Sequence, residues 1–158
     1  MWINNISLYH MPLNKFSIVL NSANKIEGTF NNSASYHFNF SQFEQCLYKV
    51  SFNFSGVPVI LNDTTEPPIL QVGLSQNNSF KSDSQTSTTI GPLRMLTSNS
   101  KTLIIGNSTD NLQTLTMTLP QNKIDVRITT YDERTIWFDP LGNDLSKYIL
   151  IMSFEKVM

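Results

Sequence analysis

The sequence predicts an all-β protein, a single domain built as a sandwich or a barrel, and three observations predict it. Four segments alternate apolar and polar residues with a period of two. About eight to ten short strand candidates follow one another, separated by Gly, Pro and Asn, and no segment has a convincing helical pattern. The chain of 158 residues has the length of one domain.

Four segments carry the clearest alternation. Each has apolar side chains on one face and polar side chains on the other, and they are Ser35–Phe40, Cys46–Ser55, Gln113–Leu119 and Lys123–Thr130. Successive strand side chains point to opposite faces, so each segment has one face for a core and one for solvent. This pattern is typical of an antiparallel sheet covered on one side.

Less regular strands complete the sheet prediction, and they are expected at Lys15–Ser22, Ile69–Ser75, Leu93–Thr97 and Thr102–Gly106. The last strand, Lys147–Val157, is apolar on both faces for several residues, which predicts a central strand covered on both sides. The only helical possibility is a turn at Gln42–Gln45. The connection Ser75–Thr89 is longer than a usual hairpin loop, which is typical of a functional or mobile loop.

Composition and charge exclude several classes of protein. Eleven basic and 12 acidic residues give a net charge of -1, which excludes a strongly basic surface, and we expect no nucleic-acid partner. One cysteine, Cys46, excludes an internal disulfide and a multi-cysteine metal site, and a lone thiol fits a reducing compartment. We see no signal-peptide pattern and no apolar run of membrane-spanning length, so we expect no membrane span.

A search for catalytic motifs favours a protein that is not an enzyme. His37 lies on the polar face of a strand, His10 is far from it in the sequence, and Cys46 is best explained as a buried structural thiol. The sequence has no GxSxG, P-loop or GxGxxG motif, and the acidic stretch from Asp125 to Asp144 lacks EF-hand spacing. We therefore expect no catalytic residues, no cofactor and no metal.

Contact with other proteins is the expectation that the polar residues favour. Asn, Ser and Thr replace charged residues on the strand faces, and a neutral face suits a protein packed in an assembly. Residues 1–14 lie outside the strand pattern and are expected to form an N-terminal arm, with 15–158 as the single domain. Trp2 and Tyr9 in this arm, and Phe80 in the long loop, are the candidate interface residues.

Two segments carry a family pattern. In Phe16–Phe40 the matching residues are Leu20, Asn21 and Ser22, then Gly28 and Thr29, then Tyr36, Phe38 and Phe40. In Lys123–Glu155 they are Val126, Ile128 and Thr129, then Trp137 and Asp139, then Tyr148 to Glu155. Together these segments resemble the small jelly-roll virion proteins, of minor capsid or vertex type, of eukaryotic DNA viruses, virophages and polinton-like viruses.

The resemblance implies a single eight-stranded jelly-roll sandwich of two antiparallel sheets, and the number of strand candidates agrees with it. It also implies a non-enzymatic structural protein of a viral capsid: a minor capsid, vertex or capsid-surface component. Such a protein would form a homo-oligomer, a trimer or a pentamer, and would contact the major capsid protein. It would be located in the virion after assembly inside the host cell.

Two other functions remain open on the same residues. The fold would also suit the receptor- or glycan-binding head of a virion fibre, in which exposed aromatic side chains stack on the ligand. A glycoside hydrolase would need a pair of carboxylates in a cleft, and no pair of acidic residues in the sequence stands out for that role.

Overall fold

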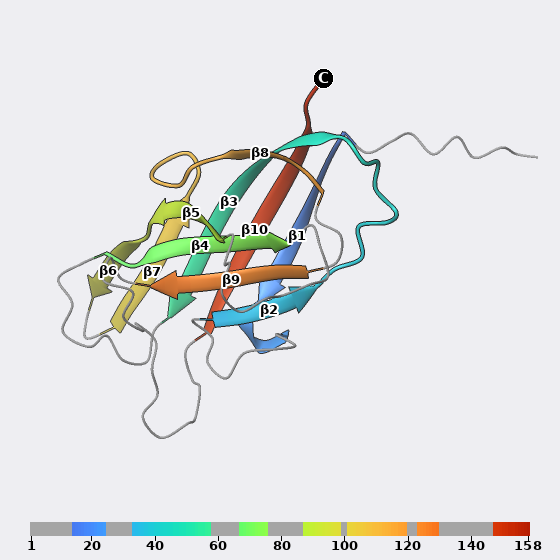
Figure 1. The fold of residues 1–158 in the computed structure, drawn as a ribbon. Helices are drawn as coiled ribbons and strands as arrows, with labels where there is room; N and C mark the ends of the chain where they lie inside the picture. Colours follow the sequence, from blue (N-terminus) through green and yellow to red (C-terminus); the bar gives the residue numbers. More distant parts are fainter. Residues whose placement is uncertain are drawn as a thin grey trace, which may run out of the picture.

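The computed structural model describes residues 14–24, 33–57, 67–75, 87–98, 101–119, 123–129 and 147–158, and these form an all-β, sandwich-like fold of two antiparallel sheets. The described part contains ten strands and one short 3-10 turn, η1 (Ser22–Asn24). The ten strands agree with the upper end of the predicted number. In Figure 1 the strands of one sheet cross obliquely over those of the other.

The larger sheet has six strands, in the order β1-β10-β3-β7-β6, with β8 also paired to β3. Their bounds are β1 Lys15–Asn21, β3 Leu47–Val57, β6 Arg94–Ser98, β7 Lys101–Asn107, β8 Leu115–Thr118 and β10 Lys147–Lys156. Strand β3 pairs with β8 through its first residues and with β7 through its last ones. Between these two pairings, the Oγ atom of Ser108 accepts a hydrogen bond from the backbone N–H of Phe52 over 2.6 Å.

The smaller sheet has four strands, in the order β2-β9-β4-β5. Their bounds are β2 Ser33–His37, β4 Ile69–Ser75, β5 Ser87–Pro92 and β9 Lys123–Thr129. Strand β5 begins at Ser87, inside the segment Ser75–Thr89 for which the sequence predicted a long loop. The sequence did not predict this strand, because its Ser and Thr residues give no alternation of apolar and polar side chains. Gly91 in β5 has a φ of 141°, and a Cβ there would lie 2.8 Å from the carbonyl oxygen of Asn111.

The four alternating segments form strands as predicted, but two are shorter than expected. Strand β2 ends at His37, because the side-chain oxygen of Asn39 accepts a hydrogen bond from the backbone N–H of Ser41 and starts a turn. Strand β8 covers only Leu115–Thr118. Residues 41–43 form a turn and no helix, as the sequence indicated.

One continuous core fills the space between the two sheets. Its members come from both sheets, and those with the largest fully buried side chains are Phe40, Tyr48, Phe52, Phe54, Tyr148 and Phe154. The Tyr36 hydroxyl of β2 donates to the Tyr148 hydroxyl of β10 over 2.8 Å, so a buried hydrogen bond links the two sheets. Burial raises the pKa of Tyr36 to about 12, against the opposing effect of the hydrogen bond to Tyr148.

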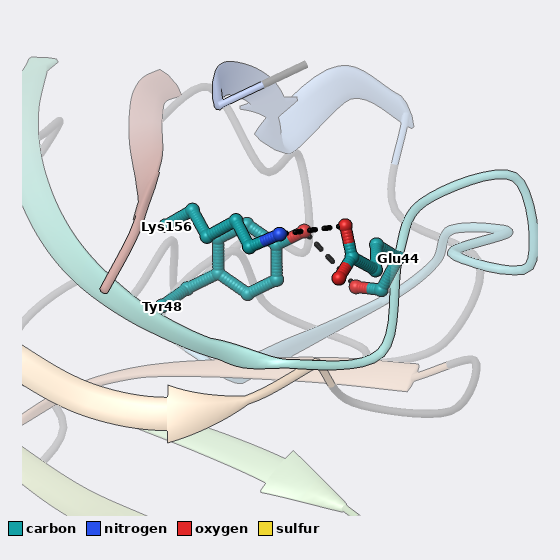
Figure 2. Close-up of polar contacts among 3 residues, drawn as sticks. All are labelled: Glu44, Tyr48 and Lys156. Atoms are coloured by element: carbon teal, nitrogen blue, oxygen red, sulfur yellow. Dashed lines mark hydrogen bonds and ion pairs between the residues drawn. The ribbon is translucent and has the colours of Figure 1, made fainter. Parts of the chain in front are cut away.

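The connection between β2 and β3 is held at the edge of this core. The ring of Phe16 stacks between those of Phe43 and Phe154, with centroids 3.9 Å and 4.8 Å away. Figure 2 shows the polar contacts beside them: the Lys156 ammonium lies 2.7 Å from the Glu44 carboxylate, and the Tyr48 hydroxyl donates to the Glu44 carbonyl oxygen over 3.0 Å. The connection is therefore bound to both β3 and β10.

Candidate interaction surface

The structure describes only some of the residues that the sequence singled out. Trp2, Tyr9 and Phe80, the expected interface residues, lie outside the described residues. His37 is exposed on β2. Cys46 is partly buried and packs against the core, so it is less deeply buried than the sequence analysis expected.

Two other kinds of feature are absent from the described ranges. No group of three or more His, Cys, Asp or Glu side chains comes together there in a way that could hold a metal ion. The same ranges contain no helix with the length and apolar character needed to cross a membrane.

The outer face of the four-stranded sheet is polar and charged. Its central strand β9 presents Lys123, Asp125 and Arg127, which alternate with core residues. The Asp125 carboxylate accepts a hydrogen bond from Ser35 on β2 and lies 3.9 Å from the Lys123 ammonium. Charged groups with partners of this kind are typical of a face in contact with water.

The outer face of the six-stranded sheet has a different chemistry. Seven aliphatic side chains from five strands occupy one part of it, and we call them the aliphatic patch: Val19, Val57, Leu96, Leu103, Ile105, Ile149 and Ile151. Val19 is 62% exposed, Val57 54% and Ile149 43%. Single exposed aliphatic residues are common on soluble proteins, but a patch that runs across neighbouring strands marks a contact surface.

The strand register brings these residues side by side. Val19 on β1 pairs with Ile151 on β10, and Leu96 on β6 pairs with Leu103 on β7. Ile149 and Ile105 lie on either side of Ser55 of β3, in one row across the sheet. The patch is therefore continuous from β1 to β6. Neutral polar residues such as Ser55 lie between its aliphatic members, and two exposed cations border it, because Arg94 pairs with Ile105 and Lys147 pairs with Val57.

The remainder of this face grades from neutral to charged along the strands. Next to the row of Val19 and Ile151 is a row of serines, in which the Ser17 and Ser153 hydroxyls are 2.8 Å apart. The following row is charged, because Glu155 pairs with Lys15 on one side and with Lys49 on the other. The charged row thus lies at one end of the face, the serine row and the aliphatic patch lie beside it, and Lys147 and Arg94 border the patch at the other end.

The patch corrects one prediction about the last strand. Strand β10 is central in its sheet, as predicted, but the described residues cover only one of its faces. Tyr148, Leu150, Met152 and Phe154 point into the core, whereas Ile149 lies exposed on the opposite face. The sequence signal for the patch was the continuous apolar run of β10, and the sequence analysis attributed it to a covering layer.

Two comparisons with known proteins returned nothing. No protein-family profile matches this chain, and no curated protein is detectably similar to it in sequence.

Proposed function

We propose that this protein is a non-enzymatic structural component of a viral capsid, a minor capsid, vertex or capsid-surface protein that works through contacts with other proteins. The observation that carries the proposal is the difference between the two outer faces. One face carries paired charged side chains along its inner strand β9. The other has an exposed aliphatic patch and a neutral row of serines in its middle, with charged residues at its two ends. The core of a protein interface is depleted of charge, and the middle of the second face has that composition.

The fold that we propose is an eight-stranded jelly roll, with β6 and β8 as additions. A jelly roll is one long hairpin of eight strands rolled into two sheets, so the first strand pairs with the last, the second with the seventh, and so on inward. The strand pairs β1–β10, β2–β9, β3–β7 and β4–β5 follow this order. All four pairs are antiparallel, as such a hairpin requires.

The family resemblance is consistent with this arrangement. The two segments that carry it are far apart in the sequence, yet β1 in the first pairs with β10 in the second, and β2 pairs with β9. The two segments of the resemblance are therefore paired with each other in both sheets. On this basis we propose a homo-oligomer, a trimer or a pentamer, that contacts the major capsid protein in the virion.

Proteomics of purified, intact virions of the virus that encodes this chain tests the proposed function. The expected result is that the protein remains with purified particles at a fixed copy number relative to the major shell protein. Its absence from particles would refute the capsid function. Glycan-array binding by a protein that is a fibre component would instead favour the receptor- or glycan-binding head.

A further inference from the structure

We propose that the outer face of the six-stranded sheet binds a second copy of this chain, face to face, about a two-fold axis. The inference rests on the proposed function, because it assigns the surface through which the protein associates with itself. Two packed sheets lie about 10 Å apart with their strands inclined by roughly 30°, and their side chains interdigitate. The exposed aliphatic patch and the serine row provide the uncharged centre that such packing needs.

The size of the face fits a stable pair. An axis between β3 and β10 superimposes four strand positions, those of β1, β10, β3 and β7, the last continued by β8. Four strands at a spacing of ~4.8 Å give a width of ~19 Å, and the eight residue steps from Lys147 to Glu155 give a length of ~27 Å. The flat area is then ~520 Å², and protruding side chains raise the accessible area toward the range of about 600–1,000 Å² that each partner contributes to a standard interface.

The charges on the face select the direction of the axis. Lys49 and Glu155 are register partners on the adjacent strands β3 and β10. A two-fold axis that runs along the strands between β3 and β10 exchanges these strands across the interface. Glu155 of each copy then lies over Lys49 of the other, and opposite charges face each other at both symmetry-related positions.

The same axis places no charged residue of β3 or β10 opposite a residue of like charge in the second copy. Lys147 on β10 pairs with Val57 on β3, so the axis places Lys147 of one copy over Val57 of the other. Ser153 pairs with Ser51, and the serine row therefore lies over the serine row of the second copy. The contact is isologous and joins chains in pairs, so a trimer or pentamer would require a second, different contact.

Sedimentation equilibrium of the purified chain, with a set of variants, tests the inference. The wild-type protein is expected to have twice the mass of one chain at micromolar concentration. Ile149→Glu puts a charge in the centre of the aliphatic patch and should raise the dissociation constant about 30-fold or more. Val19→Glu, on the edge strand β1, is a second variant with the same expected direction.

Two further variants make the test specific. Thr89→Glu adds the same charge at an exposed position of β5 in the other sheet and should leave the dimer unchanged. Lys49→Glu should weaken the dimer by placing two carboxylates together. The double variant Lys49→Glu with Glu155→Lys should restore most of the affinity, because the pair across the interface is again opposite in charge, and the remaining loss is expected because the new ammonium lies beside Lys15 of its own chain. Far-UV circular dichroism confirms that each variant is folded.

A monomeric wild-type protein would overturn the inference, and so would an oligomer of three or five chains that Ile149→Glu does not change. Failure of the charge reversal to restore the dimer would overturn the proposed axis. These outcomes are separate from those of the particle proteomics. A chain that is monomeric in solution but present in particles would retain the capsid function and refute the dimer. A chain that forms the dimer but is absent from particles would retain the dimer and refute the capsid function.

Discussion

Two neighbouring residues of β10 provide a direct test of which face each strand buries. Leu150 is fully buried and Ile149 is 43% exposed, although they are adjacent in the sequence and similar in hydrophobicity. We predict that Leu150→Ala destabilises the folded monomer far more than Ile149→Ala does. The reasoning depends only on burial, since both substitutions remove three carbon atoms from the same strand.

The magnitudes follow from the exposed fractions. Loss of three buried carbons costs about 2.4 kcal/mol in transfer free energy, and the cavity left in a closed core raises the total for Leu150→Ala to about 3–5 kcal/mol. At Ile149 a little over half of the side chain is covered, and solvent fills the space that the substitution opens. The cost there is about 1.4 kcal/mol, so the two variants should differ by at least about 1.5 kcal/mol.

Urea unfolding followed by far-UV circular dichroism measures both values. The measurement is made at a protein concentration low enough that the midpoint no longer depends on concentration, which removes any contribution from association. The pair Leu20→Ala and Val19→Ala on β1 repeats the comparison, because Leu20 is 4% exposed and Val19 62%, with the difference that Val19→Ala removes two carbons and Leu20→Ala three. Equal costs in the monomer, or a larger cost at Ile149, would refute the assignment of the two faces.

Three further predictions concern the interior and its turns. Gly91→Ala should cost more than about 2 kcal/mol of unfolding free energy, because φ is 141° and the new Cβ would collide with a backbone carbonyl. Ser108→Ala should cost about 1–2 kcal/mol, because the backbone N–H of Phe52 loses its acceptor. Burial is the main cause that raises the pKa values of Tyr36 and Tyr48 to about 12, from 10.0 in the unfolded chain. Below pH 10 both phenols are neutral in the folded and in the unfolded chain, and their contribution to stability is fully present. The free energy of unfolding should therefore fall as the pH rises from 10 to 12, and urea unfolding at a series of pH values measures it.

Controls are available in the same strands and turns. Gly73→Ala should cost less than the glycine substitution in β5, because its nearest contact is a side-chain carbon at 3.2 Å. Thr109→Ala, at an exposed position beside Ser108, should change the free energy of unfolding by less than about 0.5 kcal/mol. Tyr36→Phe should flatten the alkaline loss of stability, and an unchanged slope would contradict the assignment of that loss to this phenol.

The local pattern of the sequence was sufficient for most strands and for the side chains that they bury. In β3 the alternation that placed Tyr48, Val50, Phe52 and Phe54 on one face is the pattern of burial in the structure. The reason is physical, because the pleat turns successive side chains to opposite faces whatever the strand pairs with. Strand β5 was not predicted at all, because its Ser, Thr, Gly and Pro residues give no apolar alternation.

The candidate interaction surface could not be recognised from the sequence in the same way. Val19 and Ile151 are far apart in the chain and meet only because β1 pairs with β10 in one register. A shift of that register by one residue would turn the aliphatic side chains to the other face. No local pattern carries this information, so the continuity of the patch depends on the pairing of distant strands.

The sequence by itself determined that the chain forms strands, and it determined which side chains of most strands share a face, because both follow from residue type and a period of two. The tertiary structure decided which of the two apolar faces of β10 lies in the core, since that depends on where the four-stranded sheet packs. It also decided that Ile149 remains exposed and Ile151 only partly buried, beside the aliphatic side chains of four other strands. The same residues could have filled a core, and it is the position of the second sheet that made them a surface.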